Sequence, residues 1–261
     1  MLPIERYSRI LDVLDRQSTI RTTEVCELCG VSPITARADL SELERQGKLK
    51  RTHGGAISLS GTLVVSPPND RATINVSAKR RIAQVASTFV SDGDSLLVDT
   101  GTTTFEFVKA LVRKRNLTIV TNDCAIAEYV EREMPTSVAV QLGGTVRRVH
   151  RYSYGLLTCA NVKQLYADKV FMGANSLVPD VGFMTEFEPE AAVKSLFVAH
   201  ARRRYMLMDS TKLGSYNYMR FAGLADFDEL IIESDPQGSF ATLIKEEGSA
   251  THLCVADDFV R

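Results

Sequence analysis

The chain has 261 residues, 44% of them hydrophobic and 24% charged, which is the composition of a soluble globular protein long enough for two domains. The formal net charge is −1, so any affinity for nucleic acid must come from a local cluster of cations. No apolar run reaches the ~20 residues of a membrane helix. The N-terminal stretch MLPIERYSRILDVLDRQ lacks a signal-peptide cleavage site and the five cysteines are scattered, so we expect a cytoplasmic protein with reduced thiols.

The first 59 residues begin with two stretches of helical spacing. The first helix is expected to bury an apolar face made by Ile4, Tyr7, Ile10, Leu11 and Leu14. In the second helix Thr22 is the expected N-cap, and Val25 and Leu28 are expected to face the core. Gly30 fits the position after the helix end, where a positive φ is favourable for glycine.

A third helix follows this turn at once. Ser32 is its expected cap, Pro33 fits the first helical position because its missing N–H costs nothing there, and Gly47 is expected to end it. Its buried stripe is Ala36, Leu40 and Leu43. The strands LKRT and AISL then flank the turn HGG. Together these elements predict an α+β domain of the winged helix-turn-helix type.

The third helix and the hairpin carry polar and cationic side chains suited to a DNA duplex. Arg37 is expected to face outward near the helix start, which reaches base edges in the major groove, and its guanidinium can bind guanine through two hydrogen bonds. Cations on the hairpin are expected to meet phosphates. The predicted DNA-binding residues are Ser32, Pro33, Thr35, Arg37, Ala38, Ser41, Lys48, Lys50, Arg51, His53 and Gly54. Docking of another protein is the alternative, which cations on both helix and wing disfavour.

Two patterns in this domain match those of a known family. VSPITARADL matches V-S-x-x-T-I-R-R-D-L at Val31, Ser32, Thr35, Arg37, Asp39 and Leu40, and RTHGGA at 51–56 matches R-x-H-G-G-A. On these residues the domain resembles the DNA-binding domain of the DeoR family of bacterial transcriptional regulators. Ala36 replaces an isoleucine of that pattern, and Ala38 replaces a second arginine, so one cation that reads bases or phosphates is absent. Because such proteins usually read paired half-sites of operator DNA, we expect a homo-oligomer, a dimer or larger.

The remainder of the chain changes in character after residue 59. Residues 60–76 contain Pro67-Pro68 and few periodic apolar positions, and they are expected to form a linker. Within residues 77–261 the strands SLLVD, LTIV, VAVQL, DKVFMGA, RYMLMD, ELIIE and HLCVA alternate with helices that include 189–201 and 239–247. This alternation predicts an α/β domain whose mostly parallel sheet is covered by helices on both faces.

Polar stretches occur at the carboxyl ends of these strands, where ligands bind in such sheets: DTGTTT at 99–104, TND at 121–123, GGTVRR at 143–148 and DSTK at 209–212. The threonines supply hydroxyls and backbone N–H groups at a helix start, which favours an anion such as a phosphate. Lys212 and Arg147 can add charge, and Asp99 can accept hydrogen bonds from sugar hydroxyls. A threonine-rich turn alone is more often a helix cap, so the four stretches together carry the prediction.

The motifs DTGTTT, TN, LGG, ADKVFMGA and DSTK, with Glu190 and Lys194 in EPEAAVKSLFVAHA, also occur in a familiar order. On these motifs residues 77–255 resemble the DeoR-type sensor domain, whose fold is related to ribose-5-phosphate isomerases and CoA-transferases. The resemblance implies a repressor of a carbohydrate operon whose DNA binding is modulated by a phosphorylated sugar. The effector-binding residues that it implies are Asp99, Gly101, Thr102, Thr103, Thr104, Asn122, Gly143, Gly144, Arg147, Glu190, Lys194, Asp209 and Lys212. The resemblance says less about Arg148 and Tyr152.

Two other functions are open to the same residues. Asp99, Glu190 and Lys194 could serve an isomerase of sugar phosphates, with a carboxylate as general base. A structural DNA binder that senses no ligand is the third hypothesis. We expect a regulator with no catalytic residues, because a DNA-binding segment has a direct use only there. Cys26-x-x-Cys29 is a single pair within a helix, so neither a metal nor a cofactor is expected.

Overall fold

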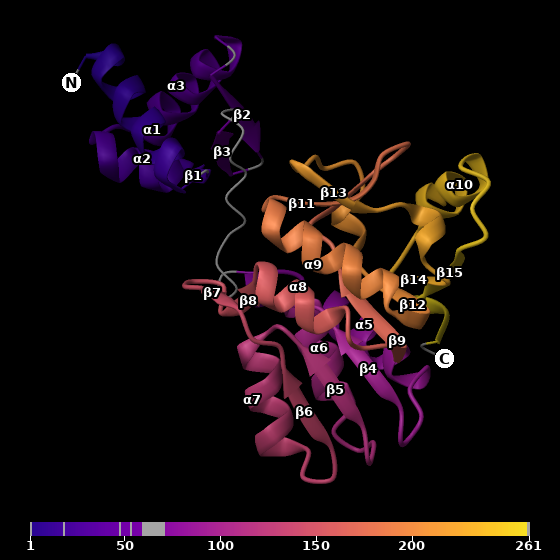
Figure 1. The fold of residues 1–261 in the computed structure, drawn as a ribbon. Coiled ribbons are helices and arrows are strands. Elements are labelled where there is room, and N and C mark those ends of the chain that lie inside the picture. The colour runs from indigo at the N-terminus through magenta and orange to yellow at the C-terminus, as the bar shows by residue number, and fades with distance from the viewer. Residues whose placement is uncertain (1, 18, 47, 53, 59–70, 260–261) are drawn as a thin grey trace. The chain divides into compact units, whose positions relative to one another are not determined.

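The chain divides into two compact units, Met1–Val65 and Ser66–Arg261. The structure, a computed structural model, describes residues 2–17, 19–46, 48–52, 54–58 and 71–259, and Figure 1 labels their helices and strands. Residues 60–70 of the expected linker lie outside the described residues. Residues 71–76 belong to the second unit, whose first long helix, α5 (Val76–Thr88), begins at their end.

The first unit is a winged helix-turn-helix, as predicted. Its elements are α1 (Pro3–Gln17), β1 (Thr19–Arg21), α2 (Thr22–Cys29), α3 (Pro33–Arg45), β2 (Leu49–Thr52) and β3 (Gly55–Ser58). The two predicted strands pair with each other, and β1 adds a third antiparallel strand in the order β1-β3-β2. The sequence did not predict β1, because three residues are too few to show an alternating pattern.

The core of this unit differs from the expectation at the start of α1 and of α2. Ile10 and Leu14 are fully buried with the predicted stripe of α3, whereas Ile4 is 74% exposed, so the apolar face of α1 starts one turn later than expected. Thr22 is the first residue of α2 rather than its cap, and the N-cap is Arg21, whose backbone N donates to Glu24 Oε2 at 2.7 Å. Gly30 has the expected positive φ, 64°, and Gly47 lies outside the described residues.

An ion pair holds the buried side of α3 to α1. The guanidinium of Arg6 donates from Nε and Nη2 to the two carboxylate oxygens of Asp39 at 2.6 and 2.8 Å. Asp39 is buried, although it lies only two residues after the outward-facing Arg37. This bidentate contact fixes how α3 is rotated about its own axis, because the two hydrogen bonds define both a distance and an orientation.

The second unit is built on a seven-stranded sheet in the order β15-β14-β12-β9-β4-β5-β6, with every neighbouring pair parallel. The strands are β4 (Ser95–Val98), β5 (Thr118–Thr121), β6 (Val138–Gln141), β9 (Ala167–Gly173), β12 (Ala201–Leu207), β14 (Glu229–Ile232) and β15 (His252–Val255). Each corresponds to one of the seven predicted strands. The predicted mostly parallel α/β sheet is therefore confirmed.

Helices cover both faces of this sheet (Figure 1). Leu96 and Val98 of β4 pack with α5, α6 (Thr102–Ala110) and α7 (Cys124–Glu133). Leu97 points to the other face, which packs against α8 (Leu156–Val162), α9 (Glu188–Ala199) and α10 (Ser239–Glu246). Alternate residues of one strand thus enter two separate cores, which is why these strands read as continuous apolar runs.

Short elements that the sequence did not predict extend this unit. They are the hairpin β7 (Thr145–Arg147) and β8 (Tyr152–Tyr154), the antiparallel sheet of β10 (Ser176–Val178), β11 (Gly182–Thr185) and β13 (Met219–Ala222), and the 3-10 helices Ser210–Lys212, Leu224–Asp226 and Ala256–Phe259. None is longer than four residues, so none carries a periodic signal. The hairpin replaces part of the polar stretch that was expected to be an open turn.

The order of the strands places a crevice beside β4. The chain runs from β4 through β5 to the edge strand β6 and then returns to β9 on the other side of β4. Connections therefore leave the carboxyl ends of β4 and β9 in opposite directions, which opens a space for ligands at this point of an α/β sheet. Asp99 follows β4 directly, and Gly173 ends β9.

Alanine substitutions at two adjacent glycines of the wing test how closely β3 packs against β1. Gly55→Ala should lower the free energy of unfolding of the first unit by about 1–3 kcal/mol or more, because an added Cβ would lie 1.9 Å from Ile20 O of β1. Gly54→Ala is the matched control, since nothing lies within 4 Å of its Cβ position. Urea unfolding of both full-length variants measures the difference. Equal stability of the two variants would contradict the close approach of β1 and β3.

Candidate functional site

The N-terminal turn of α3 presents the first group of predicted DNA-binding residues. Ser32 caps the helix, accepting from Thr35 N at 3.3 Å, and the two hydroxyls are 3.0 Å apart. Pro33 is exposed at the first helical position. The Thr35 hydroxyl is thus close to the cap rather than isolated on the outward face. Arg37 and Ala38 are exposed, and within the described part of the chain the guanidinium of Arg37 has no hydrogen-bonding or ion-pairing partner.

The wing is joined to α3 by polar contacts. Ser41 Oγ donates to Arg37 O at 2.9 Å and accepts from Arg51 Nη1 at 2.7 Å. The backbone N of Arg51 donates to Glu44 Oε1 at 2.7 Å. Arg51 therefore lies against the helix, a contact that sequence reasoning did not foresee. Of the other predicted wing residues, Lys48 and Gly54 are exposed, and both His53 and the side chain of Lys50 lie outside the described residues.

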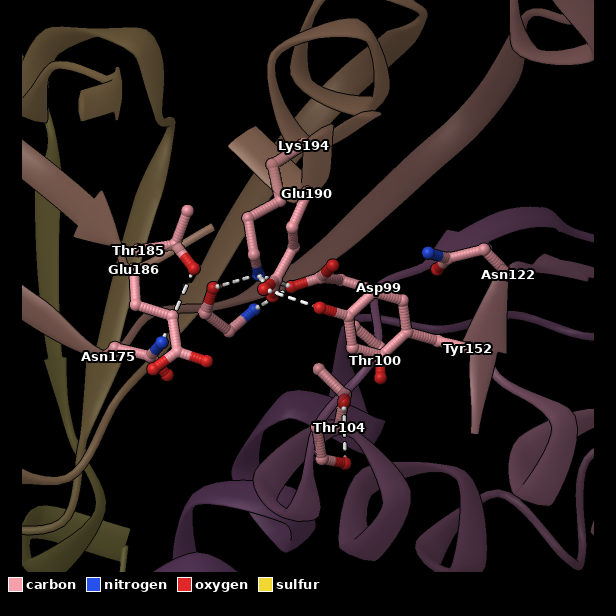
Figure 2. Close-up of polar contacts among 12 residues, drawn as sticks. Asp99, Thr100, Thr104, Asn122, Tyr152, Asn175, Thr185, Glu186, Glu190 and Lys194 are labelled. Carbon is pink, nitrogen blue, oxygen red and sulfur yellow. Dashed lines mark hydrogen bonds and ion pairs between the residues drawn. The ribbon is translucent and has the colours of Figure 1, made fainter. Parts of the chain in front are cut away.

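In the second unit, a buried lysine joins the ends of β4 and β9 (Figure 2). Lys194 of α9 pairs through Nζ with Asp99 Oδ2 and donates to Gly173 O at 3.0 Å. Asp99 Oδ2 also accepts from Gly173 N at 3.0 Å. Lys194 is 3% exposed and Asp99 1%. Two residues taken from the family resemblance thus meet at the crevice between the two strands.

A chain of polar contacts continues from this pair. Glu190, one turn before Lys194 on α9, lies 3.6 Å from its ammonium and accepts from the Tyr152 hydroxyl at 2.9 Å. The same hydroxyl accepts from Arg147 Nη1 at 2.7 Å. Arg147 Nη2 then donates to Glu186 Oε1 at 2.9 Å. The charge of Arg147 is therefore already paired with carboxylates, and Tyr152, which the sequence left aside, is the link.

Burial dominates the protonation of this cluster. It raises the pKa of Asp99 from 3.8 to about 6; Glu190 adds to the rise, whereas the Lys194 ammonium opposes it. Burial also raises the pKa of the Tyr152 hydroxyl, with Glu190 acting in the same direction. The pKa of His150 is lowered from 6.5 to about 4, first by burial and then by the charges of Arg147 and Arg71. These shifts mark a poorly hydrated site in which hydrogen bonds and charges act strongly.

The threonine-rich loop after β4 leads into α6 at the same crevice. Its N-cap is Gly101, with a φ of 150° and no side-chain cap. Thr100 Oγ1 instead donates to Asp123 Oδ2 at 2.7 Å, and Thr104 Oγ1 donates to Gly101 O at 2.9 Å. Thr102 and Thr103 are half-buried in the first turn. Gly101 has no side chain with which to cap the helix, and the Asp123 carboxylate accepts from its backbone N–H. The N–H groups of Thr102, Thr103 and Thr104 have no acceptor among the described residues.

The remaining residues of the predicted β5 and β6 turns have different surroundings. Asn122, 1% exposed, donates through Nδ2 to Ser153 O at 2.9 Å, and its buried Oδ1 has no partner among the described residues. Gly143 and Gly144 lie against α8. Gly143 O accepts from Thr158 Oγ1 at 2.7 Å, and a Cβ on Gly144 would lie 2.1 Å from Thr158 Oγ1. Close packing against α8 explains Gly144 in structural terms, whereas a Cβ on Gly143 would meet nothing nearer than Asn161 Nδ2 at 3.7 Å.

The DSTK turn lies beside the start of α5. Asp209 is buried and accepts from Asn75 Nδ2 at 3.0 Å. Lys212 is half-buried, and both residues act electrostatically on Lys79. Burial lowers the pKa of Lys79, whose ammonium donates to Ile74 O at 2.7 Å. A second cationic group thus lies near this turn, and no motif in the sequence distinguished it.

Arg71 is the residue whose place the sequence could least foresee. It falls in the expected linker, yet its Nη1 donates to Asn175 Oδ1 at 3.4 Å and its buried Nε has no partner among the described residues. Burial lowers its pKa, opposed by the charges of Glu190 and Glu186. Figure 2 shows Asn175, Thr185 and Glu186 grouped on the β11 side of the crevice. Their only sequence signal was a polar run at the end of a short strand.

Metal ligands and membrane helices were also sought within the described ranges. There, no three His, Cys, Asp or Glu side chains gather in a way that could hold a metal ion, and no helix is long and apolar enough to cross a membrane. Cys26 is half-buried and Cys29 is buried in the first unit, and both are free thiols.

Comparisons with known proteins match both units. A model of the DeoR-like helix-turn-helix domain matches residues 6–62, and a model of the DeoR C terminal sensor domain matches residues 74–234. The HTH-type transcriptional regulator FruR of Bacillus subtilis (strain 168) is 31% identical over 87% of this chain and 89% of its own. The HTH-type transcriptional repressor GlcR of the same organism is 30% identical over 94% and 93%. The lactose phosphotransferase system repressor of Staphylococcus aureus (strain N315) is 30% identical over 92% and 95%.

Solved structures were compared as well. Ribose 5-phosphate isomerase A from Methanocaldococcus jannaschii aligns with a TM-score of 0.39 and 16% identity over 53% of this chain and 55% of that chain. The eIF2B delta of Chaetomium thermophilum aligns with a TM-score of 0.43 and 13% identity over 78% and 65%.

The buried lysine provides a test of the crevice. Lys194→Met should lower the stability of the second unit by about 3–5 kcal/mol at pH 8, because the Asp99 carboxylate stays buried without its cation. The loss should shrink toward pH 5: the pKa of Asp99 is already raised to about 6, so the folded state takes up a proton before the unfolded state does. Hydrogen exchange of the β4 and β9 amides at both pH values measures the effect.

Lys163→Met is the matched control, because Lys163 is exposed on the surface. It should change stability by no more than about 0.5 kcal/mol at either pH. A Lys194→Met variant as well protected as the control at pH 8 would show that the ammonium does not hold the strand ends together.

Proposed function

The chain belongs to the DeoR family of transcriptional regulators, and on that premise we propose that it represses a carbohydrate operon. We further propose that a phosphorylated sugar, bound in the crevice between β4 and β9, modulates its binding to operator DNA. Two of the relatives above are named repressors, one of them of a lactose phosphotransferase system. The proposal assigns the chain no catalytic role and places it in the cytoplasm with the DNA that it regulates.

The observation that carries the effector assignment is the start of α6. The first four N–H groups of a helix have no acceptor within the helix. In α6 the Asp123 carboxylate accepts from the N–H of Gly101, and those of Thr102, Thr103 and Thr104 have no partner among the described residues. This end of the helix opens beside Asp99, at the point of the sheet where ligands bind. We assign the phosphate of the effector to these N–H groups and to the hydroxyls of Thr102 and Thr103, since the helix dipole favours an anion there.

The cations of the site divide into two roles. Arg147 is paired with Glu186 and lies 3.8 Å from Glu190, so we assign it to holding these carboxylates rather than to the phosphate. Lys212 has no ion pair among the described residues and is left for the phosphate. Asp99, Glu190 and the unpartnered Asn122 Oδ1 are acceptors for sugar hydroxyls. Thr104, whose hydroxyl is used within the loop, and the glycines 143 and 144 shape the site.

The DNA side of the proposal rests on α3 and the wing. Arg37 projects without a partner among the described residues, and Arg51 is held against the helix by Ser41. Two cations at one face of a winged helix can contact a base edge and a phosphate together. We propose that two or more copies of the chain bind the half-sites of one operator.

A phosphorylated sugar should change the affinity of the full-length protein for the DNA upstream of its own gene. The expected result is a response to one sugar phosphate in a panel of pentose and hexose phosphates, in a mobility-shift titration. The same sugar without its phosphate should act only at concentrations at least about tenfold higher, because the anion site at α6 stays empty. Specific DNA binding that no member of the panel alters would contradict the sensor assignment and leave the DNA-binding assignment standing.

A carboxylate placed at the start of α6 should compete with the phosphate. Thr102→Glu should abolish the response to the sugar phosphate through like-charge repulsion, whereas melting temperature should not fall, because an acidic residue stabilises a helix N-terminus by about 0.3–1 kcal/mol. Thr102→Gln has nearly the same size without the charge and is the matched control. Calorimetry with the active sugar phosphate measures both variants. Equal binding by the two would move the phosphate away from α6.

A further inference from the structure

The most exposed apolar side chain on α3 lies where the helix faces outward. Ile34 is 79% exposed, although it directly follows the helix-starting Pro33 and is a large β-branched residue. It takes no part in the core of the first unit, which uses Ala36, Leu40 and Leu43 of the same helix. Folding therefore leaves a large apolar group in water with no structural use within the described part of this unit.

The helical spacing places Ile34 at the centre of the outward face. Successive residues turn by about 100° around a helix, so Arg37, Ala38 and Ser41 lie on the same side as Ile34. These residues are exposed or half-buried, whereas the opposite side is buried. Arg51 reaches this face through its hydrogen bond to Ser41. An apolar spot made by Ile34 and Ala38 is thus bordered by two arginines.

We propose that Ile34 is a specificity-determining residue that packs against the C5 methyl group of a thymine in the operator, an inference that rests on the assignment of the chain as an operator-binding regulator. Within the major groove the apolar group that a base pair offers is this methyl. The flanking arginines suit phosphates and guanine edges, which a protein partner with an apolar surface would not present.

The position of the thymine follows from the geometry of α3. Ile34 and Arg37 are three residues apart, which corresponds to about 4.5 Å along the helix axis. Base pairs are stacked about 3.4 Å apart. The thymine that Ile34 contacts therefore lies within about two base pairs of the guanine that Arg37 binds, and each half-site contains both.

The test removes the methyl group from the DNA and the side chain from the protein. Duplexes that the full-length protein enriches from a random library supply the operator, and each thymine is then replaced singly by deoxyuridine, which lacks only the C5 methyl. Fluorescence anisotropy measures the Kd of the parent protein, of Ile34→Ala and of Ile4→Ala. Ile4 is a matched control, because it is 74% exposed in the same unit but lies on α1.

One thymine in each half-site should be coupled to Ile34. Its replacement should weaken binding of the parent and of Ile4→Ala about fourfold, the effect of about 0.8 kcal/mol for one buried methyl. The same replacement should leave Ile34→Ala unchanged, and that variant should bind the thymine duplex about as weakly as the parent binds the deoxyuridine duplex. Such a double-mutant cycle isolates the contact between the two groups.

Results that contradict the thymine contact can be told apart from results that contradict DNA binding itself. An enriched operator without any thymine coupled to Ile34 overturns this inference alone, and parent-like DNA binding by Ile34→Ala would assign the exposed side chain to a protein partner. A protein that enriches no sequence overturns the inference together with the DNA-binding assignment. Because Ile34 is exposed and alanine favours helices, the variant should fold, and its melting temperature checks this.

Discussion

One buried ammonium holds together the ends of β4 and β9, where the crevice of the second unit lies. Lys194 reaches from α9 to the carboxylate that follows β4 and to the carbonyl that ends β9. Removing such a charge from water costs desolvation free energy, and the oxygens that surround the ammonium offset this cost. The carboxylate in turn accepts from Gly173 N, so each partner has more than one contact. These contacts therefore hold the ends of β4 and β9 to α9.

The ionic contacts around this pair also limit what the crevice can accept. Asp99, Glu186 and Glu190 lie close to Lys194, Arg147 and Arg71, so negative and positive charges nearly balance in the interior. Hydrogen-bonding groups without net charge suit such a setting, whereas a multiply charged group does not. In the function proposed above, the anionic part of the ligand instead meets the N–H groups of the first turn of α6, because the helix dipole favours an anion there.

Periodicity in the sequence predicted the winged domain and all seven strands of the parallel sheet, because most of these elements are runs whose pattern follows from burial. The edge strand β6 is the exception, since its Val138 is 59% exposed. Prediction from periodicity failed where an element was too short to show a pattern, or where two contacting residues are far apart in the sequence. The three residues of β1 show no alternation, and Ile4 fits the helical spacing of α1 but faces water. Arg71 is close enough to Glu190 for their charges to interact, although the two are far apart in the sequence. Gly144 matched a site motif, yet its place is explained by α8.

The long sequence separation within the crevice has a consequence during synthesis. Asp99 and Lys194 are 95 residues apart, which corresponds to roughly 5–20 s of translation at typical rates of about 5–20 residues per second. The winged domain is complete in sequence well before that, and its core uses none of the later residues. A ribosome stalled between these two positions would therefore carry a chain whose winged domain can fold, whereas its second unit still lacks Lys194. A chain truncated before Lys194 keeps the complete winged domain but never gains the residue that joins the ends of β4 and β9.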